Sequence, residues 1–268
     1  MALDIIIVGA LGRMGVEVAN VVLADDALKL KACIEYSGHP RVGEDYGICL
    51  GRGPLGFSLT DSIDKIDFNN AVVIDFSSPQ SSKNLFQNAE KKAMKLVVCT
   101  TGLTESDLEL ARSVSKKVPV IVSPNMSLGV NLFFYITQMV ASKLKDNFDI
   151  EIIEAHHRFK KDSPSGTAKK LGEIVAHEIG LPYEQAIVNG REGIKQDCRS
   201  RTEVGMHAVR GGDIVGDHTV LFAGIGERIE LRHMAHSRSV FAQGAVTTAK
   251  WLSAQGPGYY SMKDVLGI

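Results

Sequence analysis

This sequence has few cysteines and almost no net charge. The 268 residues include four cysteines, Cys33, Cys49, Cys99 and Cys198, and none of them forms a Cys-X-X-Cys pair. Scattered cysteines of this kind are typical of free thiols in a reducing compartment, so we expect no disulfide framework. The formal net charge of −1 implies no general attraction to nucleic acid or to a membrane surface.

Long apolar runs are missing as well. The most apolar long window, Leu128 to Ala141, is shorter than a bilayer span and contains Asn131 and Gln138. The first four residues carry no basic segment of the kind that opens a signal peptide. We therefore expect a cytoplasmic protein with no membrane partner. Its 44% hydrophobic residues suit a globular chain with a substantial core, arranged as one large domain or two moderate ones.

The chain begins with an apolar run rich in β-branched residues. Residues 4–8 predict a strand that is buried on both faces within a parallel sheet. A glycine loop follows, and residues 16–24 and 28–34 then predict a helix and a second strand. This strand–loop–helix–strand order is typical of the start of a dinucleotide-binding fold.

The glycine loop has the spacing GxxGxxG, at Gly9, Gly12 and Gly15. These glycines allow a tight turn, close approach to a pyrophosphate, and close packing of the following helix. Glu35, at the end of the second strand, can accept hydrogen bonds from an adenosine ribose. Because the spacing departs from the commoner GxGxxG, a plain turn remains the alternative, although the context favours a nucleotide site.

Alternating strands and helices continue to residue 122, which predicts an α/β fold of the Rossmann type with a doubly wound parallel sheet. Polar side chains follow the strands at Ser77, Thr100 and Asn125, where ligands bind in such sheets, although turn chemistry alone would explain any one of them. A glycine-rich stretch, residues 38–56, interrupts the pattern and is interpreted as a surface excursion. The predicted strands and helices of this part are 71–76, 79–93, 95–99, a helix from 104, and 118–122.

A second mixed α/β domain with a largely antiparallel or mixed sheet is expected after a helix at 128–144. One covered sheet face would leave the other in need of a partner, which suggests oligomerisation. We assign residues 1–127 and 239–268 to a dinucleotide-binding domain, and residues 128–238 to substrate binding and oligomerisation. The expected elements are strands 149–153, 203–209, 213–222 and 227–232, helices 168–179 and 239–253, and an irregular stretch 181–201.

The densest polar segment is residues 154–168, between a predicted strand and a predicted helix. Adjacent residues of an extended chain point to opposite sides, so His156 and His157 should have different roles, and Lys160 can return to one of them across a bend. Ser165 is a plausible helix cap, with Gly166 and Thr167 at an anion-attracting helix start. A polar surface loop followed by a capped helix is the plain alternative.

The later strands carry further histidines, but none has a zinc-like pattern with cysteine or carboxylate support, so no metal is expected. These histidines and the nearby arginines are interpreted as surface groups, one of which could meet a substrate carboxylate. They are His207, His218, His233 and His236, with Arg210, Arg232 and Arg238.

Over essentially its whole length the sequence resembles the 4-hydroxy-tetrahydrodipicolinate reductase (dihydrodipicolinate reductase) family. The resemblance lies in residues 8–15, 100–102, 123–127 and, above all, the EAHHRFKKDSPSGTA segment at 154–168. It implies an NAD(P)H-dependent oxidoreductase of diaminopimelate and lysine biosynthesis. It also implies a homotetramer that reduces 4-hydroxy-tetrahydrodipicolinate, via dihydrodipicolinate, to tetrahydrodipicolinate.

The resemblance also implies roles for individual residues. His156 and Lys160 would be catalytic, and His157, Gly166 and Thr167 would bind the carboxylates of a small cyclic dicarboxylate. No nucleic acid is implied. The cofactor-binding residues would be Gly9, Ala10, Leu11, Gly12, Arg13, Met14, Glu35, Cys99, Thr100, Thr101, Ser123, Pro124, Asn125 and Met126.

Cofactor choice depends on the residue after Glu35. Tyr36 stands where some members of the family place an arginine for a 2′-phosphate, so NADH is expected to be preferred, with NADPH possible. Arg13 and Arg41 could weaken this preference. Two other functions fit part of the pattern: another two-domain dehydrogenase, and a dinucleotide sensor without turnover. A DNA-binding sensor should show a basic helical module, and none is visible in the sequence.

Overall fold

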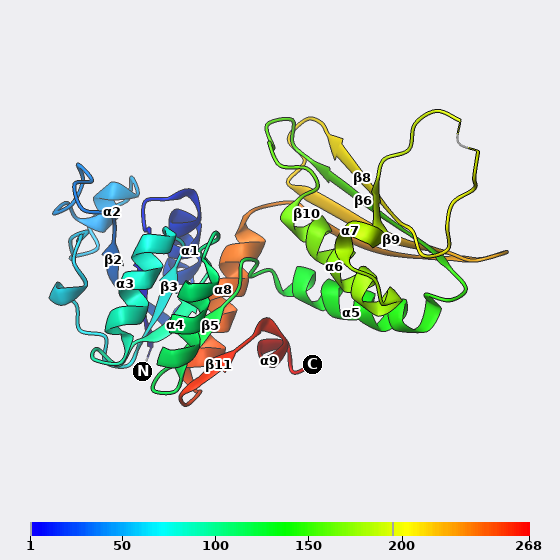
Figure 1. Ribbon diagram of the computed structural model, residues 1–268. Coiled ribbons are helices and arrows are strands. Elements are labelled where there is room, and N and C mark those ends of the chain that lie inside the picture. The colour runs from blue at the N-terminus through cyan, green and yellow to red at the C-terminus, as the bar shows by residue number, and fades with distance from the viewer. Residues whose placement is uncertain (1, 195) are drawn as a thin grey trace. The chain divides into compact units, whose positions relative to one another are not determined.

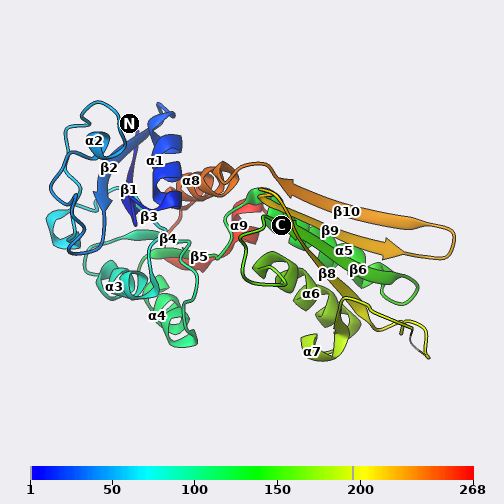
Figure 2. The same cartoon turned by 90° about the horizontal axis from the view of Figure 1, so that it is seen from above.

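The computed structural model describes residues 2–194 and 196–268, whose strands form two sheets (Figure 1; Figure 2 shows them from above). The chain divides into two compact units. The first unit extends to Leu128 and resumes with Arg238–Ile268, and the second is Gly129–Ser237. The sequence placed the domain borders at 127/128 and 238/239, one residue from each of these.

The first unit is built on a parallel sheet in the order β11-β5-β4-β3-β1-β2, as expected for a doubly wound fold. With β4 and β3 in its centre, and β1 between β3 and the edge strand β2, the sheet brings the carboxyl ends of its parallel strands to one edge. The strands are β1 Leu3–Val8, β2 Leu28–Ile34, β3 Ala71–Asp75, β4 Lys95–Val98, β5 Pro119–Val122 and β11 Gly258–Tyr260.

Helices cover both faces of this sheet, which explains the uninterrupted apolar run in β1. Ile5 and Ile7 join the core under α1 (Arg13–Leu23) and α8 (Ser239–Ser253). Ile6 and Val8 join the core on the other face, with side chains of α3 (Pro79–Ala89) and α4 (Glu105–Ser115). The predicted fold class is therefore confirmed, and α8 belongs to the first unit although it comes late in the chain.

The interpretation of residues 38–56 as a surface excursion was wrong in part. This segment contains a short helix, α2 (Tyr46–Cys49), whose first residue is fully buried. The Tyr46 hydroxyl donates to the Ala10 carbonyl at 2.7 Å, so the excursion supports the glycine loop. Three small elements were not predicted: a 3-10 turn at Ile63–Lys65, β11, and α9 (Met262–Leu266).

The second unit has a mixed sheet in the order β10-β9-β6-β8-β7. β8 runs parallel to β6 and to β7, whereas β9 runs antiparallel to β6 and β10. The core between this sheet and two helices includes Ile152, Leu171 and Phe222. The elements are α5 Leu128–Leu144, β6 Asp149–His156, α6 Gly166–Ile179, α7 Tyr183–Ala186, β7 Ile187–Asn189, β8 Val204–Arg210, β9 Gly216–Ala223 and β10 Arg228–Ala235.

Two expectations for this unit need correction. The stretch 181–201 is not wholly irregular, because it contains α7 and β7, and β9 begins at Gly216 rather than at residue 213. No helix in the described ranges combines the length and the apolar character that a membrane crossing requires.

Candidate functional site

The glycine loop has the close packing that its sequence predicted. Gly9 adopts φ +75°, and a side chain there would meet the Phe76 carbonyl oxygen at 2.7 Å. At Gly15 an added Cβ would lie 2.1 Å from the Gly9 carbonyl oxygen. The helix α1 begins earlier than predicted, at Arg13 with Gly12 as its N-cap, so its amide groups start within the loop. Such a helix start favours an anion.

Glu35 is joined to this loop by hydrogen bonds. Its carboxylate accepts from the backbone amide of Leu11 at 2.9 Å and from that of Tyr36 at 3.1 Å. The acid at the end of β2 and the glycine turn after β1 are therefore held together, as a nucleotide site in this fold requires.

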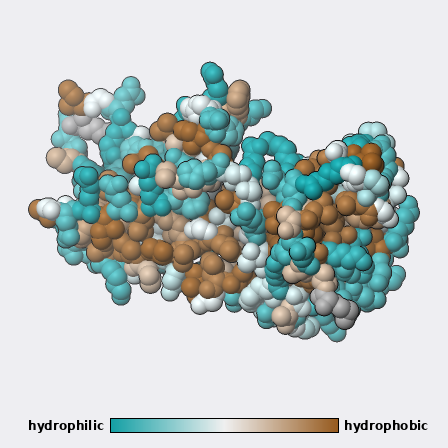
Figure 3. Space-filling model, turned by 180° about the vertical axis from the view of Figure 1, so that it is seen from behind, coloured by the Kyte–Doolittle hydropathy of each residue, from teal (hydrophilic) through white to brown (hydrophobic). Residues whose placement is uncertain are grey.

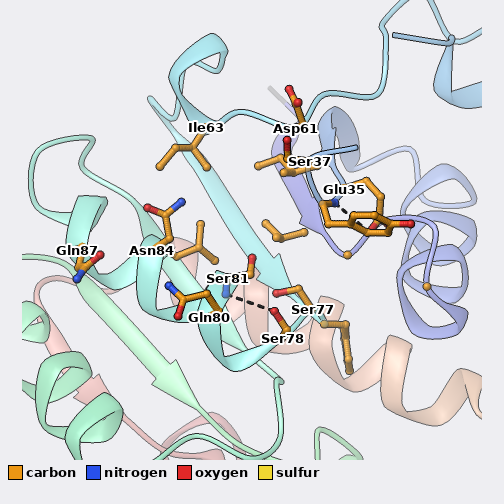
Figure 4. Close-up of a pocket in the computed structure, with 17 residues that line it drawn as sticks. Glu35, Ser37, Asp61, Ile63, Ser77, Ser78, Gln80, Ser81, Asn84 and Gln87 are labelled. Carbon is orange, nitrogen blue, oxygen red and sulfur yellow. Dashed lines mark hydrogen bonds between the residues drawn. The ribbon is translucent and has the colours of Figure 1, made fainter. Parts of the chain in front are cut away.

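A cavity of about 690 Å³ opens beside Glu35, at the carboxyl ends of β1, β2 and β3 (Figure 4). Gly9, Gly12 and Ser77 line it, together with residues of α3 between Gln80 and Gln87. Its charged lining consists of Glu35 and Asp61, with no lysine or arginine among the described residues that line it. A second carboxylate in this cavity was not foreseen from the sequence.

Asp75 is a buried carboxyl group at the end of β3, two residues before Ser77. Burial raises its pKa, while hydrogen bonds from Ser77 and Ser82 oppose that change. Its oxygens accept from the hydroxyl groups of both serines and from the Ser77 amide. This fixes the Ser77 turn that lines the cavity, so Asp75 is a structural support of the site that the sequence analysis missed.

The remaining predicted cofactor residues do not line this cavity. Cys99 and Met126 contribute buried side chains to the core, so only their backbone is available to a ligand. Ser123 and Asn125 form a local turn in which the Ser123 hydroxyl donates to the Asn125 carbonyl at 2.8 Å. The structure places the others as follows: Ala10 buried, Leu11 and Met14 packed on the core, Arg13 and Pro124 exposed, and Thr100 and Thr101 directly after Cys99.

In the second unit, β6 extends to His156 and alternates between its two faces. Ile150, Ile152, Glu154 and His156 are buried on the helix-covered face. Glu154 and His156 therefore follow two isoleucines on a buried face, where a carboxylate and an imidazole each require a polar partner. His157 follows the end of the strand and is half-buried, so the two histidines do occupy different environments.

Glu154 is completely buried and fully hydrogen-bonded. Arg210 donates to both carboxylate oxygens, at 2.7 and 2.8 Å, and the Ser165 amide donates at 3.0 Å. His156 Nδ1 lies 2.6 Å from Oε2. Burial alone would raise the pKa of Glu154, but the hydrogen bonds from Arg210, His156 and Ser165 outweigh it, and the pKa lies below its usual value.

Because Glu154 is ionised, it only accepts, so His156 Nδ1 must carry the proton of their hydrogen bond. Nε2 is then the nitrogen that gains or loses a proton. Burial lowers the pKa of His156, the Glu154 hydrogen bond opposes this, and the charges of Lys160 and Arg210 add to the lowering. A lowered pKa makes His156 a stronger acid when it is protonated.

His218 was interpreted as a surface histidine, and this was wrong. It is buried on β9, with its ring edge-on to His156 at a centroid distance of 5.1 Å. Burial, together with the charge on His156, lowers the pKa of His218 to about 3, so the ring stays neutral. Its Nε2 lies 3.0 Å from the Ser165 hydroxyl.

Lys160 returns toward the histidines across a turn, in which its amide donates to the His157 carbonyl at 3.1 Å. Its ammonium group pairs with Asp162 at 2.9 Å. His157 Nδ1 is buried and has no hydrogen-bond partner within the described chain. An orphaned buried nitrogen of this kind fits a ligand group that is absent from the protein alone.

The helix start after this loop matches the prediction. Ser165 is the N-cap of α6, and its hydroxyl accepts from the Ala168 amide at 3.2 Å. Gly166 and Thr167 form the first turn of the helix, two residues earlier than the expected start at Ala168. Their position at the positive end of a 14-residue helix suits a carboxylate.

The sequence analysis missed the roles of Glu154 and Arg210, although Glu154 was part of the motif. A signal was present, because Glu154 lies on the apolar face of the Ile150–Ile152 row and so needed a buried cation. The partner could not be identified, since Arg210 is 56 residues away. No group of three His, Cys, Asp or Glu side chains suited to a metal occurs among residues 2–194 and 196–268.

Comparison with known proteins gives the family. The model of "Dihydrodipicolinate reductase, N-terminus" matches residues 3–126, and that of the C-terminus matches residues 129–266. The chain is 43% identical to the 4-hydroxy-tetrahydrodipicolinate reductase of Geotalea uraniireducens over 264 residues, which cover 98% of each chain. The enzyme of that name from Citrifermentans bemidjiense is also 43% identical, over 98% of each chain.

Among solved structures, the dipicolinate-bound dihydrodipicolinate reductase of Paenisporosarcina sp. TG-14 has the same fold, with a TM-score of 0.76 and 24% identity. The match covers 97% of this chain and 98% of that one. An amine dehydrogenase from Mycobacterium smegmatis, at a TM-score of 0.60 and 12% identity, shares the fold more distantly. Since both halves match the family models and the full length matches its curated members, this chain belongs to the dihydrodipicolinate reductase family.

Proposed function

We propose that this chain reduces 4-hydroxy-tetrahydrodipicolinate, via dihydrodipicolinate, to tetrahydrodipicolinate in diaminopimelate and lysine biosynthesis. The observation that carries the proposal is the cluster of His156, His157 and Lys160 beside the start of α6, in a chain 43% identical to reductases of that name. The four cysteines are free, which supports a cytoplasmic location.

The residues of the second unit suit a small cyclic dicarboxylate. His157 and the first turn of α6 at Gly166 and Thr167 would bind its carboxylates. Lys160 supplies positive charge where negative charge develops as the ring is reduced. His156, held through Nδ1 by Glu154, presents Nε2 as the proton donor that completes the reduction.

The first unit suits a nicotinamide nucleotide. The turn of Gly9 and Gly12 and the N-terminus of α1 would hold the phosphates, and Glu35 would accept from the adenosine ribose. Ser77 and Ser78 add hydroxyl groups to the same cavity. When bound, the nucleotide supplies the hydride.

The test is consumption of NADH, and separately of NADPH, with substrate made freshly from pyruvate and aspartate semialdehyde by the preceding synthase. Rapid, substrate-dependent loss of reduced nucleotide absorbance supports the function. A folded protein that binds dinucleotide but oxidises neither nucleotide in this assay would contradict it and favour a sensor.

We further propose that NADH is preferred, by about tenfold or more in kcat/KM, because a 2′-phosphate would lie beside two carboxylates. Arg41 offers no relief, since its guanidinium binds Glu44 at 2.9 Å and the Cys49 carbonyl at 2.8 Å. In Asp61→Asn we expect kcat/KM for NADPH to rise while that for NADH changes little. Asp67→Asn, an acid outside the cavity, is the control, and equal rates of the two variants with NADPH would contradict the role of Asp61.

We also propose a homotetramer, assembled through the uncovered face of the second sheet. On the face opposite α5 and α6 the strand register forms one row of three apolar residues and one carboxylate, in the order Val209, Ala155, Asp217 and Met234. Ile153 lies on the same face. Ile153 is 39% and Val209 is 49% exposed. The view from behind shows further apolar surface on this unit at the level of α5, where Leu132 and Met139 are exposed (Figure 3). Such a surface is typical of an interface between subunits.

In Val209→Asp we expect the assembly to break into smaller species, because a charge would be buried without a partner. Light scattering coupled to size exclusion should give four times the chain mass for the unmodified protein and less for the variant. Ile225→Asp, at a fully exposed apolar residue in the β9–β10 turn, is the matched control. An unmodified protein that is monomeric at micromolar concentration would contradict the proposal.

A further inference from the structure

Arg210 connects three parts of the candidate substrate site. Its two terminal nitrogens bind the Glu154 carboxylate, and Nη2 also donates to the Asp162 carbonyl at 2.7 Å. Glu154 in turn holds His156 and the Ser165 amide at the start of α6. One guanidinium therefore touches the support of the histidine, the support of the helix start, and the segment that follows Lys160.

The backbone strengthens this connection. The Gly211 amide donates to the His156 carbonyl at 2.9 Å, and the Arg158 amide donates to the Gly212 carbonyl at 3.1 Å. The end of β6 and the turn after β8 are thereby fixed together on both sides of Arg210. Its planar fork matches a carboxylate with two parallel hydrogen bonds, which a lysine cannot reproduce.

We propose that Arg210 is a positioning residue for His156: it holds the Glu154 carboxylate that orients the imidazole, and it shares the charge of that carboxylate with the imidazole. The same guanidinium anchors the Asp162 segment that pairs with Lys160. This inference rests on the proposed function, because it assigns a supporting role within the same site.

Charge sharing has a direction that can be tested. The groups that face His156 are Glu154 on its own strand, Lys160 in the following turn, Arg210 at the end of β8 and the neutral His218 on β9. Without Arg210, the negative charge of Glu154 would act on His156 only, and the protonated imidazolium form of His156 would be favoured. Without the charge of Glu154, the two cations would act on His156 unopposed, and the neutral ring would be favoured.

The experiment follows the titration of His156 in the full-length free enzyme by NMR with histidine-selective labelling, assigned by the signal lost in His156→Gln. In Arg210→Met we expect the pKa of His156 to rise by about one unit and kcat to fall about tenfold or more. Glu154→Gln should move the pKa in the opposite direction. Arg210→Lys restores the charge and should return the titration toward the unmodified protein while kcat stays low.

The falling limb of the pH dependence of kcat/KM should follow these changes, because a general acid acts in its protonated form. It should move to higher pH in Arg210→Met and to lower pH in Glu154→Gln. Shifts of the falling limb in opposite directions distinguish a positioning role from simple destabilisation. Destabilisation would lower the activity of both variants without shifting their pH profiles in opposite directions.

Arg199→Met is the matched control. Arg199 is similarly buried and binds the carboxylate of Glu151 on the same strand at 2.9 Å, at the end far from His156. We expect it to leave the His156 titration unchanged. An unshifted titration in Arg210→Met, or an equal shift in Arg199→Met, would overturn the inference. If Arg210→Met does not fold, the two other variants decide: Glu154→Gln should lower the pKa of His156, and Arg210→Lys should combine a nearly unmodified titration with a low kcat.

The NMR titration needs no substrate, so the two proposals fail separately. Shifted titrations in a protein that does not reduce the substrate would overturn the function and leave the linkage standing. Normal turnover with unshifted titrations would overturn the linkage alone.

Discussion

Replacement of Lys160 by alanine is expected to lower kcat about 100-fold or more. Lys160 is the half-buried cation of the histidine turn, and its charge acts on His156. The charge that develops on the substrate ring would lose its nearest ammonium group, and no described side chain of that turn replaces it, since Arg158 and Lys161 are exposed. The measurement is steady-state oxidation of NADH at saturating substrate.

Lys161→Ala is the matched control, because it removes the adjacent, exposed lysine. It therefore changes the net charge of the protein by the same amount as Lys160→Ala. We expect kcat within about twofold of the unmodified enzyme for this variant, as for most surface substitutions. His156→Ala should resemble Lys160→Ala. Activity that survives both replacements would retain the reaction and reject these two residues as its catalytic groups.

Gly15→Ala should have the largest effect on the nucleotide-binding unit. Alanine favours a helix over glycine by about 1 kcal/mol, so an unhindered site would gain stability. Here the new methyl group would lie 2.1 Å from the Gly9 carbonyl oxygen and 2.8 Å from the Ala10 Cα, both backbone atoms. Relief requires α1 to move away from β1, and we expect a net loss of about 3 kcal/mol.

Unfolding by urea can be followed in this unit alone, because Trp251 is the only tryptophan of the chain and lies in α8. Its fluorescence should report a lower midpoint for Gly15→Ala, and calorimetry should show lost NADH binding. Gly256→Ala is the control, since a methyl group there would enter open space. Equal midpoints for the two variants would show that β1 and α1 are not packed as closely as described.

Local patterns carried most of what could be predicted about this fold. The run at residues 4–8 is apolar at every position because both of its faces are covered, and the cap at Ser165 depends on a residue only three positions away. Such signals are contained in short windows. The resemblance to a known family added the roles proposed for His156, His157 and Lys160, which periodicity alone could not supply.

The features that escaped prediction depend on distant pairs. Tyr46 meets Ala10 across 36 positions, and Ser165 meets His218 across 53. β11 has three residues, too few for a periodic pattern, and is defined only by its pairing with β5. Asp61 looks like any surface acid until the strands bring it beside Glu35. Sequence windows do not contain these contacts, because the fold creates them.

The return of the chain to its first sheet affects how the protein is made. Residues up to Leu128 leave the ribosome long before α8 and β11, which supply part of their core and one edge strand. At about 5–20 residues per second, this delay is on the order of ten seconds. Meanwhile the second unit is synthesised as one continuous segment and can fold first. The nascent nucleotide-binding half must therefore wait with β5 uncovered, the stage at which chaperones would be most needed.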